Sequence, residues 1–232
     1  MKKFLIATVV LLSSITLANA EQFRIGASAM YGGFEVDGAS EIFSGDHSSN
    51  TTSTKVTKKS SDEKEDAAGA FGLGSVFAEF AANDQLSIGV SYVPHSTDSE
   101  ETENKQNMHT TLTGEDSVST NKVKVSFEDL VTVYALANLN ENVYAKVGFL
   151  QVDLITEENL GTGGAYGNDT LDGYTIALGY NMDLADGMFV RAEAAYLEID
   201  GTTLTNTNDS TKSVSADGIT GYGAAVSVGK SF

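Results

Sequence analysis

Four charged residues lie inside segments that otherwise alternate between apolar and small side chains: Arg24, Lys146, Arg191 and Glu193. If these segments are strands, which rise about 3.3 Å per residue, the four charges lie in the same half of the fold, near its short connections. Charges of opposite sign at one level can form a network of ion pairs. In a narrow barrel, that network either closes the interior or lines a path for ions. Eight strands leave little room inside, so the ion network that closes the interior is favoured, and the path for ions is the alternative.

Two polar stretches carry acidic clusters whose oxygens are of the kind that divalent cations prefer. The clusters are Asp62, Glu63, Glu65 and Asp66, and then Asp98, Glu100, Glu101 and Glu103. Neither cluster has the Asp-x-Asp-x-Asp-Gly order of an EF-hand, so we predict solvated loops and no metal site. A local basic group could meet lipopolysaccharide phosphates or simply belong to a mixed-charge loop. It comprises Lys55, Lys58, Lys59 and Lys64.

Candidates for catalysis are few. The three histidines, His47, His95 and His109, fall in or beside polar stretches, and only His95 has a serine, Ser96, next to it. Adjacency in sequence does not make a nucleophile and a base, because their geometry must be built in space. The "GTGGAYG" motif at 161–167 lacks the Lys-Ser/Thr of a phosphate-binding loop. We therefore predict no enzyme activity, no catalytic residue and no cofactor.

The N-terminus predicts export. Lys2 and Lys3 precede a short apolar run and an Ala-Asn-Ala sequence that ends at Ala20, the order of a cleaved signal peptide at residues 1–20. The run is too short to span a bilayer as a helix. The chain carries 14 basic and 32 acidic residues, a formal net charge of −18, which disfavours nucleic acid as a partner. With no cysteine, a disulfide framework is excluded.

The rest of the chain alternates with period two, the pattern of strands with unlike faces. We expect eight strands at about residues 23–31, 67–80, 86–94, 122–137, 143–150, 173–180, 188–196 and 221–232. In six of them the faces are clear: Tyr174, Ile176 and Leu178, for example, oppose Thr175 and Ala177. The segments 67–80 and 122–137 change parity part of the way along, so a β-bulge in each could shift the register.

The connections between these strands alternate long and short, so every long one lies at one end. This arrangement, with an even number of strands, is typical of transmembrane barrels that have short periplasmic turns and long extracellular loops. We therefore predict an all-β fold at residues 21–232, an eight-stranded antiparallel up-and-down transmembrane β-barrel. Aromatic residues near the strand ends would form its interfacial girdles: Phe23, Tyr31, Tyr92, Tyr174, Tyr180, Phe189, Tyr196 and Phe232.

A secreted soluble β-protein is the alternative. It would turn its polar faces to water, and those faces should be roughly 25–35% charged. Here they carry Gly, Ser, Thr and Ala, and the charges lie in the connections. Small side chains suit a narrow lumen, and apolar faces suit lipid, so the membrane barrel is favoured.

With the signal peptide, the eight strands and the terminal Phe232, the chain resembles the small outer-membrane β-barrel family that includes OmpX, the opacity-type adhesins and the barrel half of OmpA. The resemblance covers nearly the whole mature chain and rests on pattern rather than on a diagnostic motif. It implies that the barrel-assembly machinery reads the last strand, whose matching residues are Tyr222, Val226, Val228 and Phe232. Lys230 departs from that pattern, because an apolar residue is usual there.

The function expected from this resemblance is a structural or surface-interaction role in the outer membrane, with four polar, acidic loops outside the cell. A narrow porin-like channel is the main alternative. A few such barrels modify lipid A, which is less favoured here. The expected partners are outer-membrane lipid, lipopolysaccharide, the barrel-assembly machinery and an unidentified extracellular ligand, and we expect a monomer.

Overall fold

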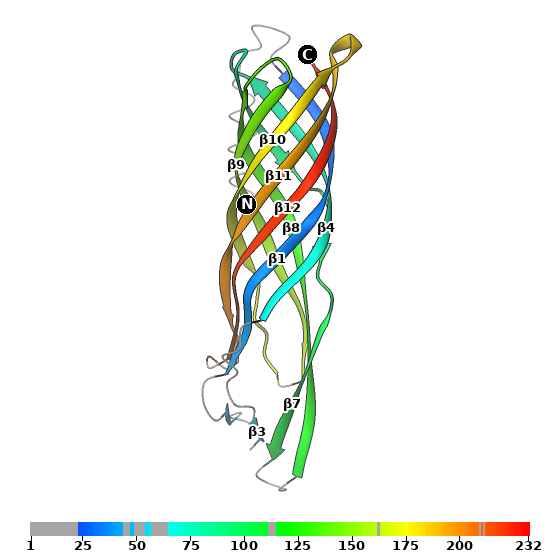
Figure 1. Cartoon of the computed structure of the whole chain (residues 1–232). Helices are drawn as coiled ribbons and strands as arrows, with labels where there is room; N and C mark the ends of the chain where they lie inside the picture. Colours follow the sequence, from blue (N-terminus) through cyan, green and yellow to red (C-terminus); the bar gives the residue numbers. More distant parts are fainter. Residues whose placement is uncertain are drawn as a thin grey trace.

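Eight long antiparallel strands close into a barrel in the computed structural model (Figure 1). The structure describes residues 23–43, 47–48, 54–56, 65–110, 115–161, 163–208, 210 and 212–232, so the predicted signal peptide lies outside the described residues. The barrel strands are β1 (Phe23–Phe43), β4 (Glu65–Ala81), β5 (Leu86–Tyr92), β8 (Glu115–Asn138), β9 (Val143–Leu160), β10 (Asp169–Asp183), β11 (Met188–Thr205) and β12 (Lys212–Ser231). The smaller described elements are β2 (His47–Ser48), β3 (Thr54–Val56), β6 (Thr97–Asp98), β7 (Thr102–Thr110) and a 3-10 turn, η2 (Ala185–Gly187).

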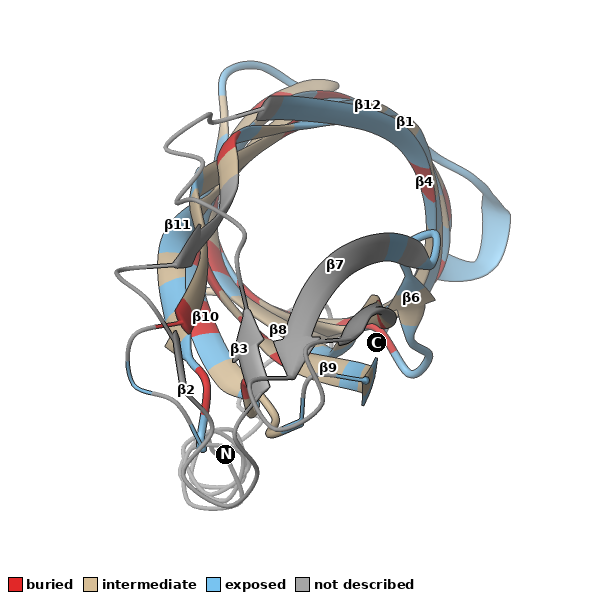
Figure 2. Cartoon of the chain, turned by 90° about the horizontal axis from the view of Figure 1, so that it is seen from below, coloured by how far each residue is buried: buried red, intermediate tan, exposed pale blue. Residues whose placement is uncertain are grey.

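The ring closes because β12 returns to β1 while β8 pairs with both β5 and β9. Figure 2 shows this ring end-on. The two ends of the described chain meet beside the short turns, where the Phe232 N–H donates to the Phe23 carbonyl at 2.8 Å. The predicted eight-stranded barrel is confirmed. No helix within the described ranges has the length and hydrophobicity to cross a membrane.

The strands are much longer than a membrane requires. About 9–11 tilted residues span a bilayer, whereas β8 has 24 residues and β12 has 20. The outward face is apolar only along the part of each strand that lies in the membrane. On β10 the outward side chains run from Leu178 through Ile176 to Tyr174, all exposed and apolar, and then change to Asp172 and Thr170.

The inward face changes in the opposite sense at the same level. On β9 the inward side chains are Lys146 and Gly148, followed by buried Leu150 and Val152. Toward the short turns the barrel is apolar outside and polar inside, and beyond that level it is polar outside and apolar inside. We call these parts the membrane segment and the outer segment.

A row of aromatic side chains marks the boundary between the two segments. It consists of Tyr31, Tyr92, Phe149, Tyr174, Tyr196 and Tyr222. Several of the tyrosines reach a carboxylate just beyond it: Tyr92 donates to Asp129 at 2.7 Å, and both Tyr174 and Tyr196 donate to Glu198. Phe189 was expected in a girdle, but it is buried in the lumen because it shares the inward face with Arg191.

The outer segment has a packed core of its own. Val152, Leu154 and Leu171 are buried there, and fully burying such a side chain is worth about 1.5–3 kcal/mol. The partly buried residues that pack against them are Val125, Phe127, Leu130, Ile199 and Leu204. This region therefore resembles the interior of a soluble β-protein.

The predicted bulge in the segment 67–80 is wrong. β4 pairs with β1 without interruption from Val36↔Ala67 to Phe23↔Phe80. The parity seemed to change because both faces carry large apolar residues, with Phe71 and Phe77 in the lumen and Val76 outside.

The predicted bulge in the segment 122–137 is confirmed. The register between β8 and β9 shifts between Glu128 and Val131. Asp129 has a positive φ of 53° there, which a non-glycine residue seldom adopts. This shift brings both Phe127 and Tyr134 to the inward face.

The polar stretches were expected to be connections, yet much of each is strand. β1 continues to Phe43, and β7 and β8 pair from Thr102↔Val123 to Thr110↔Glu115. Beyond the membrane the outward face meets water, so its residues are polar and the strand no longer reads as apolar.

We expect the level of the boundary to decide the cost of a charge on one face of one strand. Leu178→Arg should lower the free energy of unfolding in lipid vesicles by about 2–4 kcal/mol, because Leu178 lies midway along the apolar band. Thr170→Arg, on the same face of β10, should change it by no more than about 0.5 kcal/mol. Urea unfolding of both variants measures this, and equal losses would contradict the boundary.

Candidate functional site

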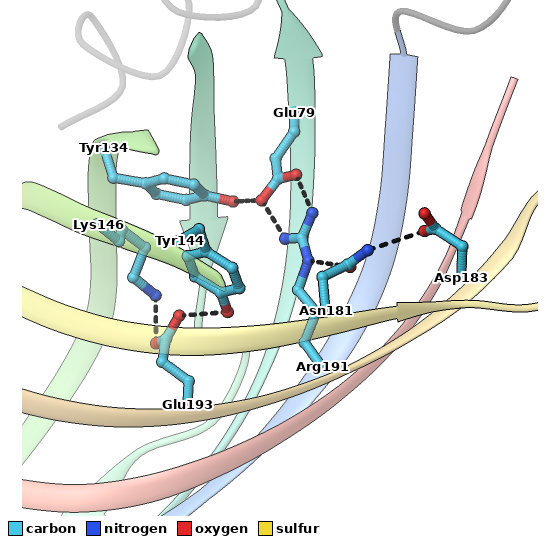
Figure 3. A network of polar contacts seen from close by, with 8 residues as sticks. All are labelled: Glu79, Tyr134, Tyr144, Lys146, Asn181, Asp183, Arg191 and Glu193. Atoms are coloured by element: carbon cyan, nitrogen blue, oxygen red, sulfur yellow. Dashed lines mark hydrogen bonds and ion pairs between the residues drawn. The ribbon is translucent and has the colours of Figure 1, made fainter. Parts of the chain in front are cut away.

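The lumen of the membrane segment holds a buried ion pair between β4 and β11. The Arg191 guanidinium donates to both oxygens of Glu79, at 2.6 Å from Nη1 and 2.7 Å from Nη2 (Figure 3). Tyr134 donates to the same carboxylate at 2.9 Å, and Arg191 Nε donates to Asn181 at 3.0 Å. The side chains of Arg191 and Glu79 are only 5% and 1% exposed, so every polar atom that points inward needs such a partner.

A second pair lies beside the first. Lys146 Nζ is 2.5 Å from Glu193 Oε1, and Tyr144 donates to Glu193 Oε2 at 3.0 Å. The two pairs and the side chains bonded to them come from β4, β8, β9, β10 and β11, and Figure 3 shows them pointing toward one another. We call the set the ionic layer: Glu79, Tyr134, Tyr144, Lys146, Asn181, Arg191 and Glu193.

Glycines on the inward face make room for the two tyrosines. A Cβ atom at Gly89 would lie 2.5 Å from the Tyr134 ring, and one at Gly179 would lie 2.1 Å from the Tyr144 ring. Neither approach is possible for a larger residue without a shift of the ring. The small residues that the sequence predicts on the lumen face therefore leave space for bulky side chains of neighbouring strands.

Aromatic rings surround the Arg191 guanidinium. Its Cζ lies 4.6 Å from the ring centroid of Phe189, 5.4 Å from that of Tyr144 and 5.7 Å from that of Phe77. Such contacts attract a cation through the ring quadrupole. Together with the bidentate carboxylate, they replace the water that Arg191 would have outside the lumen.

The structure brings together some of the charges singled out in the sequence. Lys146 and Glu193 form a pair, whereas Arg191 is paired with Glu79. Arg24 also faces inward and is the register partner of Glu79, but its buried Nε has no hydrogen-bond partner. Sequence reasoning missed Glu79. An isolated charge in the apolar stretch "GSVFAEFA" could have identified the lumen face of β4, because lipid disfavours a charge.

The acidic cluster at 98–103 pairs with two lysines of β8 in the outer segment. Lys122 lies 2.7 Å from Glu101 and 2.5 Å from Glu103, and Lys124 lies 2.7 Å from Asp98. The Lys124 ammonium and then the Ser126 hydroxyl, which both donate to Asp98, hold the pKa of that carboxyl below its ordinary value. Exposed pairs of this kind orient a strand more than they stabilise it.

The first acidic cluster is only partly described. Asp62, Glu63, Lys58, Lys59 and Lys64 lie outside the described residues. Asp66 accepts a hydrogen bond from the Gly38 N–H at 3.1 Å, and Lys55 lies in β3. Within the described part of the chain, no three His, Asp or Glu side chains gather as a metal site would require.

His95 is the histidine whose ring the structure describes. Its Nε2 accepts a hydrogen bond from the Gly74 N–H at 2.9 Å, and its Nδ1 lies 3.0 Å from the Ser96 carbonyl oxygen. Both ring nitrogens are thus engaged with backbone, and neither contacts the Ser96 hydroxyl. His47 and His109 lie in β2 and β7.

The described part of the connection between β9 and β10, residues 163–168, packs against the end of β9 and the residues that follow β11. The N–H of the buried Tyr166 donates to Glu158 at 2.7 Å. The Ala165 N–H donates to the Thr207 hydroxyl at 3.1 Å, and the Thr207 N–H donates to the Ala165 carbonyl at 2.7 Å. Gly164 has a positive φ, and a Cβ there would lie 2.1 Å from Asn206. Gly164 therefore allows this loop to approach Asn206 closely.

The last strand presents its predicted assembly residues on the outward face. Tyr222, Val226, Val228 and Phe232 are all exposed there. Lys230 shares that face at the periplasmic rim, with its Nζ 5.5 Å from the Phe232 ring centroid. The reading of this strand by an assembly machinery stays a prediction.

Comparison with known proteins identifies a family. The model of the outer membrane protein beta-barrel domain matches residues 4–232. A search of curated proteins gives no match.

Several solved structures are similar in fold at low identity. OmpT, an outer membrane protease from Escherichia coli, is 10% identical, with 95% of this chain and all of that chain covered and a TM-score of 0.38. Ail of Yersinia pestis, an attachment invasion locus protein solved with a heparin analogue, is 12% identical over 89% and 99% of the two chains, with a TM-score of 0.35. OprG from Pseudomonas aeruginosa is 9% identical over 92% and 100%, with a TM-score of 0.41. Similarity at this level does not bear on function.

We expect Arg191→Ala to lower the free energy of unfolding by about 3–5 kcal/mol, because it leaves Glu79 buried without its partner. The double variant Glu79→Gln/Arg191→Leu should recover part of that loss. Urea unfolding of the protein in lipid measures both, with Glu141→Ala in an exposed turn as the control. An unchanged midpoint for Arg191→Ala would rule out a stabilising ionic layer.

We expect Lys124→Gln to raise the pKa of Asp98 toward its ordinary value, because the donated hydrogen bond and the positive charge are lost. A carboxyl whose pKa is lowered in the folded state stabilises that state above the unfolded pKa, and the contribution disappears as the pH falls through the folded pKa. The hydrogen bonds that Lys124 and Ser126 of β8 donate to Asp98 of β6 should therefore weaken only in acid. A carbon NMR titration of the Asp98 carboxyl measures the shift. Lys122→Gln, whose lysine pairs with Glu101 and Glu103, should leave Asp98 unchanged.

Proposed function

The chain belongs to the outer membrane protein β-barrel domain family, and from this premise we propose that it is a closed, non-catalytic barrel with a structural or surface-interaction role. Its place is the outer membrane. The barrel carries its long strands and connections outward, where they meet the environment of the cell.

The observation that carries the proposal is the filling of the lumen. The ionic layer crosses the membrane segment, with Arg191 and Glu79 almost fully buried. Beyond it lies the apolar core around Val152, Leu154 and Leu171. A solute on its way through would have to break the buried pair and then pass this apolar cluster, and both steps are costly.

A narrow channel is supported less well. A path for ions needs polar groups or water along its whole length, whereas an apolar cluster formed by Val152, Leu154 and Leu171 lies in the outer segment. Modification of lipid A is also less well supported, because both ring nitrogens of His95 are occupied by backbone groups. We therefore propose no catalytic residue.

The partners of this barrel follow from its surfaces. The exposed apolar band of the membrane segment suits the acyl chains of outer-membrane lipid and lipopolysaccharide. The outward row on β12 that ends in Phe232 suits the barrel-assembly machinery. The outer segment would contact an extracellular ligand, and the barrel closes within one chain, so a monomer is sufficient.

Conductance across a planar bilayer tests the closed barrel. The refolded mature protein should give no steady single-channel steps, while an open porin added to the same bilayer should give them. Steady single-channel steps from this protein alone, with no porin added, would favour the channel instead.

A further inference from the structure

One carboxylate oxygen near the outer end of the barrel is buried without a partner. Glu158 lies on β9 beyond the boundary residue Phe149, and its side chain continues the inward row that contains Leu150 and Val152. Its Oε2 atom is buried, yet no described group lies within hydrogen-bond distance of it. Buried polar atoms without a partner are rare in folded proteins, and a buried carboxylate oxygen needs a donor or a cation.

The other oxygen of Glu158 belongs to a group in which acceptors outnumber donors. Oε1 accepts from the Tyr166 N–H at 2.7 Å and lies 2.9 Å from the Thr156 hydroxyl, which is also 2.7 Å from the Gly167 carbonyl oxygen. A hydroxyl has one proton, so it can donate to only one of these two oxygens. We call the Glu158 carboxylate, the Thr156 hydroxyl and the Gly167 carbonyl the oxygen cluster.

The connection between β9 and β10 is held so that its backbone faces the end of β9. Asn168 Oδ1 accepts from the Thr156 N–H at 3.0 Å. Gly167 has a positive φ of 80°, which glycine adopts without steric cost. A Cβ atom at Gly167 would meet no described atom within 4 Å. Open space therefore lies beside the residue whose carbonyl belongs to the oxygen cluster, and a small ion can approach there.

The atoms of the oxygen cluster are ligands of the kind that calcium prefers. Calcium binds carboxylate oxygens, backbone carbonyls and water, at about 2.3–2.6 Å from each. This is closer than the donor of an O–H···O hydrogen bond, at about 2.7–2.8 Å, so calcium fits against an oxygen that water does not reach. The net charge of −18 also favours a cation.

Other metal ions suit the oxygen cluster less well. The described part of the chain has no group of three acidic or histidine side chains, which a zinc site or an EF-hand would use. Magnesium demands near-ideal octahedral geometry, whereas calcium accepts irregular sets of neutral oxygens and completes them with water. One carboxylate with neutral oxygens beside it is therefore compatible with calcium.

We propose that the oxygen cluster is a calcium site that joins the loop at residues 163–168 to the end of β9. The charge of the ion compensates the buried Oε2 atom of Glu158, and water completes the coordination. The site lies beyond the membrane boundary, so calcium outside the cell reaches it. The inference does not depend on whether the lumen conducts, so it stands apart from the proposed function.

A calcium titration followed by amide NMR in phosphatidylcholine nanodiscs tests the site. The Tyr166 and Gly167 amides should shift with a Kd of about 10⁻⁴–10⁻³ M, as in extracellular calcium modules, and a chelator should reverse the shift. Unchanged amides at about 10⁻² M calcium would overturn the proposal. An equal response to magnesium would overturn the assignment to calcium.

Two variants separate a built site from diffuse attraction to an acidic surface. Glu158→Asp keeps the net charge but withdraws the carboxylate, and it should weaken calcium binding about tenfold or more. Glu157→Gln removes a charge from the adjacent outward residue, which is the register partner of Lys124, and it should leave the affinity within about twofold of the wild type. Affinity that follows the net charge instead of the position would overturn the proposal.

A second pair of variants tests the hydroxyl and leaves the carboxylate in place. Thr156→Val removes the oxygen at nearly constant volume and should weaken calcium binding about fivefold or more, whereas Thr156→Ser keeps the oxygen and should bind as the wild type does. Unchanged amide shifts of Tyr134 and Tyr144 in the ionic layer verify that the barrel is folded in each variant. Wild-type affinity in Thr156→Val would overturn the proposal.

Discussion

The structure depends on the change of medium that each strand meets along its length. In the membrane segment the outside is lipid, so Leu178 and Ile176 point outward and small or polar residues point inward. In the outer segment the outside is water, and the preference of each face reverses. Because side chains alternate with period two, a slip of one residue would misplace every side chain in both media at once. The reversal therefore fixes the register of the barrel and its depth in the membrane together.

The ionic layer is the consequence inside the lumen. A charge cannot face acyl chains cheaply, so Glu79, Arg191, Lys146 and Glu193 all turn inward, where a narrow barrel has little room for water. Pairing then becomes necessary, because an unpaired buried charge costs several kcal/mol. Arg191 meets this need with a bidentate carboxylate and three aromatic rings. A buried pair is weak evidence for net stability, but it does specify which strands must face one another across the lumen.

Much of the fold follows from the sequence, and less of the site does. The period-two pattern gave the number of strands, their order and the outward faces of six of them, because lipid imposes an apolar face that is easy to read. The two faces of β4 could not be distinguished in this way, because Phe71 and Phe77 fill the lumen while Val76 meets lipid. The same ambiguity hid Glu79. Pairing across the lumen joins residues 112 positions apart in the case of Glu79 and Arg191, and no local sequence pattern indicates such a contact.

The polar stretches were predicted as loops for a related reason, because a strand whose outward face meets water has the composition of a loop.

The place where the wall is incomplete follows from the same change of medium. Within lipid, every backbone N–H and C=O must be paired, so an open strand edge is excluded there. The ladder between β4 and β5 is accordingly continuous from Ala81 up to Val76, whose partner is the boundary residue Tyr92. The next donor that points to that side, the Gly74 N–H, is covered by the His95 ring. Only beyond it, where water can bond to the backbone, does β4 have no described strand on that side. The ladder between β4 and β5 therefore ends where lipid no longer requires it, and the single proline of the chain, Pro94, follows directly after β5 at that level.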